Sequence, residues 1–420
     1  MPTDPARAKR LIVGAAMVGL VLRLAFGFGY WVDRPLTHDE REYLALATSI
    51  RHGKGFTYER PPDNPDTPRF GRAPLYPVLL AAIGAGARDV TATPVQVKIA
   101  QSIVGAVGVW LIGVIARRAA GPAAGVAAAS IAAIYPPLVW ICAYVFTEPL
   151  FSTAALGSVL LLNRSIDQAS DPADATNWTA LVMATAAGVA TGLAMLIRPA
   201  MTFFVPIAAV WLIAQRRAKL SAFLVVGVLL VVTPWTLRNV RVYHRFVLIA
   251  SEGGVTFWTG NHPLATGEGD MAANPDIKVS EIAFRRNHPG LSAEELEPLY
   301  YREAVTYIVA HPGWWLVLLI KKAFYTLVPL GRSYALHSPL YRMSSLASYL
   351  VLLPFGLLGA RVWRRVAHPP ESLLPLAVSA VAACILFFPQ ERFRIPVIDP
   401  VLIVCAAVWY ARRTRETIAS

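Results

Sequence analysis

Long apolar runs, broken by short polar segments, make up most of this chain of 420 residues. A helix needs about 20 apolar residues to cross a hydrocarbon layer about 30 Å thick, so the runs predict membrane-spanning helices. We expect about ten spans, near residues 11–32, 95–116, 122–141, 149–163, 179–197, 200–215, 220–237, 346–363, 372–388 and 395–411. The pattern predicts an all-α polytopic membrane protein in which residues 1–420 form a single helix bundle.

Two further apolar segments fit a membrane span less well. Residues 74–88 are too short to cross comfortably, and residues 312–330 carry Lys321 and Lys322 in the middle of the run. A lysine pair behind two tryptophans suits a helix that lies at the membrane interface.

Composition agrees with a membrane protein and excludes several other classes. The chain is 55% hydrophobic and 15% charged, whereas soluble domains carry roughly 25% charged residues. The three cysteines lie inside apolar runs, where no zinc-ligand spacing or disulfide framework can be built from them. The net charge of +13 is spread over the chain without a soluble basic domain, so it does not indicate a nucleic-acid partner.

The distribution of basic residues predicts the orientation. The segments placed in the cytoplasm are 1–10, 117–118, 164–178, 216–219, 361–371 and 412–420. They hold 15 Lys or Arg against 6 Asp or Glu, which is the excess that marks cytoplasmic loops. The first apolar run exceeds the roughly 7–15 residues of a signal-peptide core, so we expect an uncleaved first span and cytoplasmic termini. Two large loops, 33–94 and 238–345, then lie on the outer face.

A cluster of carboxylates follows the first span, in the stretch "RPLTHDEREYLALA". It contains Asp39, Glu40 and Glu42. Thr37 and Glu40 fit a capping box, and acidic residues in a first helical turn suit the positive end of the helix dipole. The local pattern therefore has a structural explanation as well as a functional one.

Arginines occur at four separate outer turns of the predicted topology. They are Arg69 and Arg72 (followed by Tyr76 in "RAPLYP"), Arg198 in "LIRPAM", Arg238 in "PWTLRN", and Arg392 and Arg394 in "ERFRIP". One arginine at such a depth is commonly a headgroup contact. Four arginine-bearing turns together with carboxylates predict a phosphate site, because a guanidinium binds phosphate oxygens in pairs and stays charged.

Glu148 stands alone between two apolar runs in "AYVFTEPLF". An ionisable residue at such a depth is costly and indicates function by default. The alternative is a helix N-terminal acid, with Thr147 as the cap and Pro149 in the first turn.

The motifs occur in an order that resembles a known family. In sequence they are "THDEREY", "RAPLYP", "TEP", "TPWTLRN", "GGVTFWTGNHPLATG" and "RFRIPVIDP". The chain resembles bacterial GT-C glycosyltransferases of the family 39 or aminoarabinose-transferase type, and the resemblance covers nearly all of it. It implies a GT-C-like bundle with large extracytoplasmic loops, in the cytoplasmic membrane, and a polyprenyl-phosphate-linked sugar as donor. Because the chain is shorter than the aminoarabinose enzymes, the resemblance does not extend to their lipid A acceptor.

The resemblance also implies roles for particular residues. Asp39 matches the family's catalytic carboxylate, Arg72 the basic residue that contacts the lipid phosphate, and Glu148 the acid of the second outer loop. A carboxylate can take the proton of the attacking acceptor hydroxyl, and cations can neutralise the departing phosphate.

We therefore predict an inverting sugar transfer to an acceptor hydroxyl or amine. The predicted catalytic residues are Asp39 as general base, Glu40 and Glu148. The predicted donor-phosphate ligands are Arg69, Arg72, Tyr76, Arg198, Arg238, Arg392 and Arg394.

The expected partners are the lipid-linked sugar, membrane lipids and an acceptor that the sequence does not identify. We expect no cofactor and no tightly bound metal, although His38, Asp39, Glu40 and Glu148 leave a divalent cation open. Two other functions fit the outer arginines. One is a flippase or transporter of lipid-linked saccharides, which favours an internal repeat and ionisable residues inside spans. The other is a polymerase or ligase of lipid-linked glycans.

Overall fold

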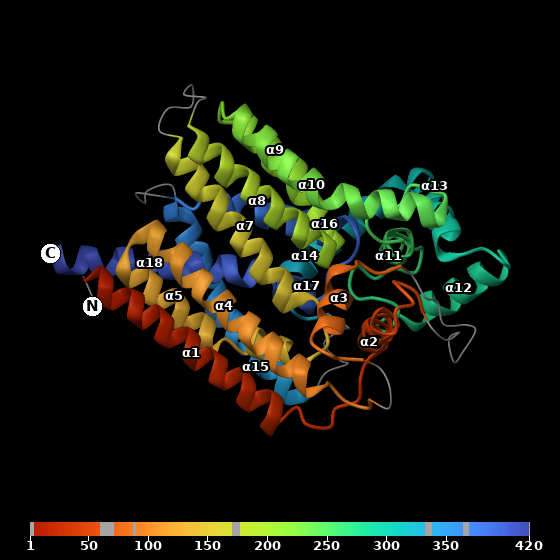
Figure 1. The fold of residues 1–420 in the computed structure, drawn as a ribbon, viewed down its shortest axis with the longest axis horizontal. Coiled ribbons are helices and arrows are strands. Elements are labelled where there is room, and N and C mark those ends of the chain that lie inside the picture. The colour runs from red at the N-terminus through yellow and green to blue at the C-terminus, as the bar shows by residue number, and fades with distance from the viewer. Residues whose placement is uncertain are drawn as a thin grey trace.

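The computed structural model describes residues 4–58, 71–86, 90–169, 177–331, 338–363 and 369–419. In these residues all regular elements are helices, which confirms the predicted fold class (Figure 1). Each of the ten predicted apolar runs lies largely in helix.

Five of the described helices are long and apolar enough to cross a membrane, or up to seven if each of two bent pairs is one span. The five are α1 (Pro5–Gly29), α4 (Val95–Ala120), α8 (Trp178–Ile197), α10 (Ala218–Tyr243) and α15 (Pro339–Val362). The bent pairs are Pro122–Ile134 with Pro136–Ala143, at 63°, and Ala293–Ala310 with Pro312–Leu327, at 110°. The predicted number of about ten spans stays a prediction.

The first bend has a local cause. Helix α5 (Pro122–Ile134) stops at Tyr135, whose backbone is extended, and α6 (Pro136–Trp140) starts with two prolines. A proline disfavours helical backbone in the residue before it and offers no N–H to the preceding turn. The 3-10 turn η1 (Ile141–Ala143) then leads towards the carboxylate Glu148.

The remaining helices divide between the bundle and one of its ends. The bundle also contains α7 (Glu148–Gln168), η2 (Pro199–Phe203), α9 (Phe204–Ala214), α16 (Leu373–Leu386) and α18 (Ile398–Ala419). The end carries α2 (His38–Arg51), α3 (Leu75–Ala82), α11 (Gly253–Gly260), α12 (Pro275–Arg286) and α13 (Ala293–Ala310). Helices α14 (Pro312–Leu327) and α17 (Glu391–Arg394) lie near the middle of the view in Figure 1, beside α16.

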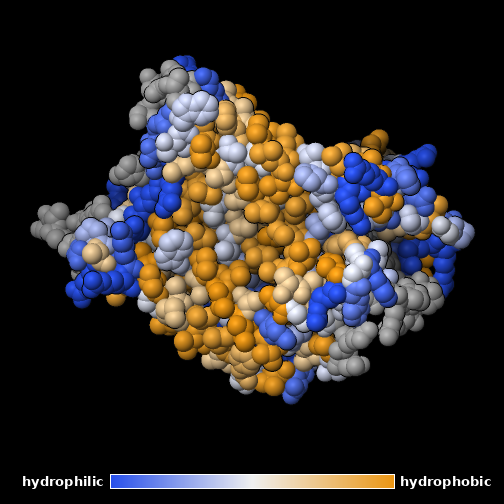
Figure 2. Space-filling view, in the orientation of Figure 1, coloured by the Kyte–Doolittle hydropathy of each residue, from blue (hydrophilic) through white to orange (hydrophobic). Residues whose placement is uncertain are grey.

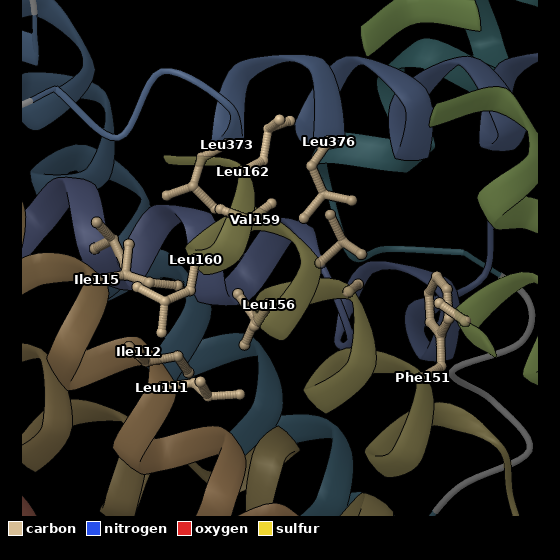
Figure 3. Close-up of a cluster of buried hydrophobic side chains, with 14 of the residues drawn as sticks. Leu111, Ile112, Ile115, Phe151, Leu156, Val159, Leu160, Leu162, Leu373 and Leu376 are labelled. Carbon is tan, nitrogen blue, oxygen red and sulfur yellow. The ribbon is translucent and has the colours of Figure 1, made fainter. Parts of the chain in front are cut away.

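Small residues allow the bundle helices to approach closely. A Cβ added to Gly188 of α8 would lie 2.1 Å from the carbonyl oxygen of Leu224, and one on Gly227 of α10 would lie 2.2 Å from that of Thr185. Such contact between small residues is a common way for helices to pack in lipid, where burial of apolar surface gives little driving force. The central core joins side chains of α4, α7 and α16, including Ile115, Leu160 and Leu376 (Figure 3).

The arrangement separates an apolar belt from two polar ends. Apolar residues cover the middle of the surface in Figure 2, and hydrophilic residues gather on both sides of it. Both chain termini lie at one end of the bundle, and α2, α11, α12 and α13 lie at the other (Figure 1). The protein is therefore a multi-pass membrane protein in which helices of the two large loops, 33–94 and 238–345, meet at the end opposite its termini.

Candidate functional site

The start of α2 is fixed by the predicted capping box. Glu40 accepts hydrogen bonds from the N–H of Thr37 at 2.7 Å and from its hydroxyl at 2.8 Å through one oxygen. Its other oxygen accepts the N–H of Val145 at 2.8 Å. Burial raises the pKa of Glu40, and these hydrogen bonds oppose the rise. With both oxygens occupied in this way, Glu40 positions α2 against the segment before α7 and is not placed to exchange a proton with a substrate.

Asp39, the neighbour of Glu40, lies between two arginines from distant parts of the chain. One carboxylate oxygen accepts Nη2 of Arg72 at 2.8 Å, and the other accepts Nη1 of Arg392 at 2.8 Å. Burial opposes ionisation of Asp39, but the two guanidinium charges outweigh it and hold the pKa of its carboxyl well below the usual value. Asp39 is therefore ionised in this arrangement.

Arg72 forms ion pairs with three carboxylates of the cluster. Besides Asp39, it donates to Glu42 through both Nε (2.9 Å) and Nη2, and to Glu252 through Nη1 (2.7 Å). Its guanidinium also lies 5.4 Å from the centre of the Tyr43 ring, within the range of a cation–π contact. Three carboxylates thus share one cation.

Arg392 has a different set of neighbours. It donates to Gln390 through Nε at 2.9 Å, and its Nη2 lies 3.9 Å from a carboxylate oxygen of Asp270. The rings of Phe146 and Phe393 lie 5.1 and 5.4 Å from its guanidinium. Together with the three acids on Arg72, four carboxylates face two guanidiniums, and His38 lies 3.5 Å from one of these acids, Glu42.

A second ion pair borders this cluster. Glu148, at the start of α7, is 2% exposed and accepts Nη1 of Arg198 at 2.6 Å. The Arg198 guanidinium lies 4.4 Å from the ring of Phe393, which is the ring that Arg392 also contacts. Glu148 is therefore paired, because an unpaired charge buried in apolar surroundings is costly in free energy. Its partner Arg198 and Arg392 contact the same ring, that of Phe393.

Three predicted phosphate ligands are placed elsewhere. Arg394 is 3% exposed, donates to Asp399 at 2.8 Å and stacks on Tyr349 at 3.7 Å, so it is a core residue of the bundle. Arg238 donates to Asn239 and Tyr243 and lies over the ring of Trp235.

Tyr76 is fully buried, and its hydroxyl accepts a hydrogen bond from Gln101 at 3.1 Å. Its ring packs edge-on against the ring of Tyr43, with 5.1 Å between the two ring centroids. Arg69 lies outside the described residues. Of the predicted phosphate ligands, Arg72 and Arg392 share Asp39, and Arg198 is adjacent.

Sequence reasoning gave no role to Glu252 or Asp270 and named Glu42 only as part of the acidic stretch. Glu252 lies in the second large loop, 180 residues from the arginine that it contacts. Its one sequence signal is the Gly253-Gly254 pair that follows it at the start of α11. Among the described residues, no three His, Cys, Asp or Glu side chains are grouped as metal ligands.

The fold and this cluster define the class of the molecule: a polytopic helical membrane protein with an arginine–carboxylate site at one end of its bundle. Residues 73–237 match the model of the family described as dolichyl-phosphate-mannose-protein mannosyltransferase. No curated protein matches the chain.

Solved structures of an archaeal oligosaccharyltransferase show the same fold over nearly the whole chain. The archaeal oligosaccharyltransferase AglB from Archaeoglobus fulgidus, in complex with an inhibitory peptide and a dolichol-phosphate, matches 97% of this chain and 50% of its own at 15% identity, with a TM-score of 0.58. The Archaeoglobus fulgidus oligosaccharyltransferase in its apo form matches 98% of this chain and 51% of its own, also at 15% identity, with a TM-score of 0.57. ArnT from Cupriavidus metallidurans bound to undecaprenyl phosphate matches 98% of this chain and 79% of its own at 14% identity, with a TM-score of 0.41.

The chain thus spans about half the length of these oligosaccharyltransferase chains. The resemblance expected from the ordered motifs is confirmed, as a family match over residues 73–237 and as a GT-C-like fold.

Proposed function

We propose that this protein is an inverting glycosyltransferase that transfers a sugar from a polyprenyl-phosphate donor to an acceptor hydroxyl or amine. The observation that carries the proposal is the sharing of Asp39 between Arg72 and Arg392. This arrangement brings a carboxylate and two anion-binding groups to one point. The family match over residues 73–237 and the fold shared with AglB favour this reading over a flippase.

The donor phosphate is held by the two arginines. Both are partly exposed, with 13% and 26% of their side-chain surface accessible, and both donate to carboxylates that a phosphate can replace. A guanidinium binds phosphate as it binds a carboxylate, through paired N–H groups. The prenyl tail then lies along the apolar belt of Figure 2.

Phosphate binding also changes Asp39. Once Arg72 and Arg392 donate to the phosphate, Asp39 loses the two charges that hold its pKa low, and its burial then favours proton uptake. The freed carboxylate takes the proton of the acceptor as the acceptor oxygen or nitrogen bonds to the anomeric carbon. The bond from that carbon to the phosphate oxygen breaks, and the lipid phosphate leaves against the arginines. Glu148 takes part through Arg198, which it holds beside Arg392.

The sidedness follows from the basic loops. The chain termini and the helices that carry the site lie at opposite ends of the bundle (Figure 1). With cytoplasmic termini, the site therefore lies on the extracytoplasmic face of the cytoplasmic membrane.

Binding of a donor analogue, the methyl phosphodiester of undecaprenyl phosphate, followed by native mass spectrometry, tests the proposal. We expect wild type to bind the lipid and Arg72→Ala to bind it at least about tenfold more weakly, equivalent to about 1.4 kcal/mol. Arg238→Ala is the matched control, because Arg238 contacts its own aromatic cluster, and it should bind like wild type. Equal indifference of all three proteins to the lipid would remove the basis of the proposal.

A further inference from the structure

Glu252 forms an ion pair with Arg72, the arginine that the proposed function assigns to the donor phosphate. Its Oε2 lies 2.7 Å from Nη1 of Arg72, and the side chain is 25% exposed. We propose that Glu252 makes the site discriminate between the donor, a phosphodiester, and the lipid product, a phosphomonoester, so that the product is expelled. This inference rests on the proposed function and adds a residue that sets its phosphate specificity.

The position of Glu252 is fixed by the backbone. The residue before it, Ser251, accepts the N–H of Gly71 through its hydroxyl at 2.8 Å and donates its own N–H to the carbonyl of Gly71 at 3.0 Å. Arg72 and Glu252 therefore follow directly after two residues that are joined by one backbone hydrogen bond and one hydrogen bond to a side-chain hydroxyl. The contact is a consequence of this pairing between the two outer loops and not of a mobile surface side chain.

The segment around Glu252 is also held from the side of helix α13. The hydroxyl of Ser251 also donates to Glu294 at 3.0 Å. Glu297 accepts the backbone N–H groups of Gly253 and Gly254 at the start of α11. Helix α13, which carries both glutamates, thus holds the Glu252 segment against Arg72.

The charge of Glu252 beside Arg72 repels the lipid product more strongly than the donor. The donor phosphodiester carries one negative charge, whereas the product phosphomonoester approaches two above the second phosphate pKa of about 6. The Coulomb energy between Glu252 and the phosphate scales with the phosphate charge, so Glu252 repels the product about twice as strongly as the donor.

Without such repulsion, two arginines would hold the dianionic product more tightly than the monoanionic donor. The other charged groups near Glu252 are Arg72, Asp39, Glu42, Arg198 and Glu297. Three of these five are acids, so the surroundings reinforce the repulsion.

The test compares two lipids on matched proteins. The probes are undecaprenyl phosphate and its methyl phosphodiester, with dissociation constants measured at pH 8 and at pH 5. At pH 8, Glu252→Gln should tighten binding of the monoester at least about tenfold more than binding of the diester. At pH 5 this difference should vanish, because both lipids are then monoanions and because burial raises the pKa of Glu252, which favours its neutral form at low pH.

Two further variants control for charge and folding. Glu252→Asp keeps the charge and should retain the discrimination of wild type. Glu295→Gln removes one negative charge from an exposed capping position that pairs with Arg245, and it should leave the ratio of the two affinities unchanged. Since glutamine also serves in a capping box, this control preserves the start of α13.

The outcomes separate the two proposals. If both lipids bind and Glu252→Gln changes their affinities equally or not at all, the inference about Glu252 is wrong while the phosphate site stands. If neither lipid binds wild type, the proposed function fails, and this inference fails with it.

Discussion

Replacement of Asp39 by asparagine separates the chemistry of the site from its architecture. Asn has nearly the shape of Asp, keeps one carbonyl oxygen as an acceptor and loses the charge and the basicity. In the proposed mechanism no other group takes the acceptor proton. We therefore expect Asp39→Asn to lose transfer while it still folds and still binds the lipid phosphate.

The structure sets the size of both effects. Arg72 keeps Glu42 and Glu252, and Arg392 keeps Gln390 and the nearby Asp270. The loss is therefore limited to charge-assisted hydrogen bonds at a partly exposed site, about 1–3 kcal/mol in the free energy of unfolding. Loss of a general base lowers the rate about 10²–10⁴-fold, or roughly 3–5 kcal/mol in the barrier.

Reconstituted protein and a labelled polyprenyl-phosphate sugar give the assay. Single-turnover transfer to a membrane extract reports the chemistry, and thermal unfolding in detergent reports the fold. Asp276→Asn, in the exposed first turn of α12, is the matched control and should transfer like wild type. Wild-type transfer by Asp39→Asn would refute the assignment of the base, and a variant that does not fold would refute the view that Arg72 and Arg392 have sufficient other partners.

Four other predictions concern single features. Glu40→Ala should unfold at a lower temperature than wild type, because the Val145 N–H loses its buried acceptor, at about 1–3 kcal/mol. Burial raises the pKa of Glu391 to about 7, so wild type should lose up to about 3 kcal/mol as the pH rises from about 4.5 through 7, and Glu391→Gln should not; parallel pH profiles of the melting temperature would contradict this. Arg394→Met should destabilise by about 3–5 kcal/mol, since the fully buried Asp399 loses its cation, and the double variant Arg394→Met/Asp399→Leu should recover part of the loss. A chelator should leave transfer unchanged; a loss that one divalent cation restores would show a metal requirement.

The helical bundle could be predicted from the sequence because lipid offers no hydrogen-bond partners to the backbone. In lipid each backbone N–H needs a partner within the protein, and a long continuous apolar run meets this need by itself as a helix. The capping box was equally predictable, since Thr37 and Glu40 lie three residues apart and need no tertiary partner. The resemblance to the family was also predictable, because the order of the motifs depends only on the chain.

The composition of the site was decided by the tertiary structure. Asp39 meets Arg392 across 353 residues, and Arg72 meets Glu252 across 180, so no local pattern carries either pair. Arg392 and Arg394 illustrate the reason. They stand two residues apart in the short helix α17, where a step of two turns a side chain by about 200° around the axis. One therefore reaches Asp39, and the other is buried against Asp399 and Tyr349. The sequence determined that arginines lie at this depth of the membrane, whereas the packing of α17 determined which one faces the site.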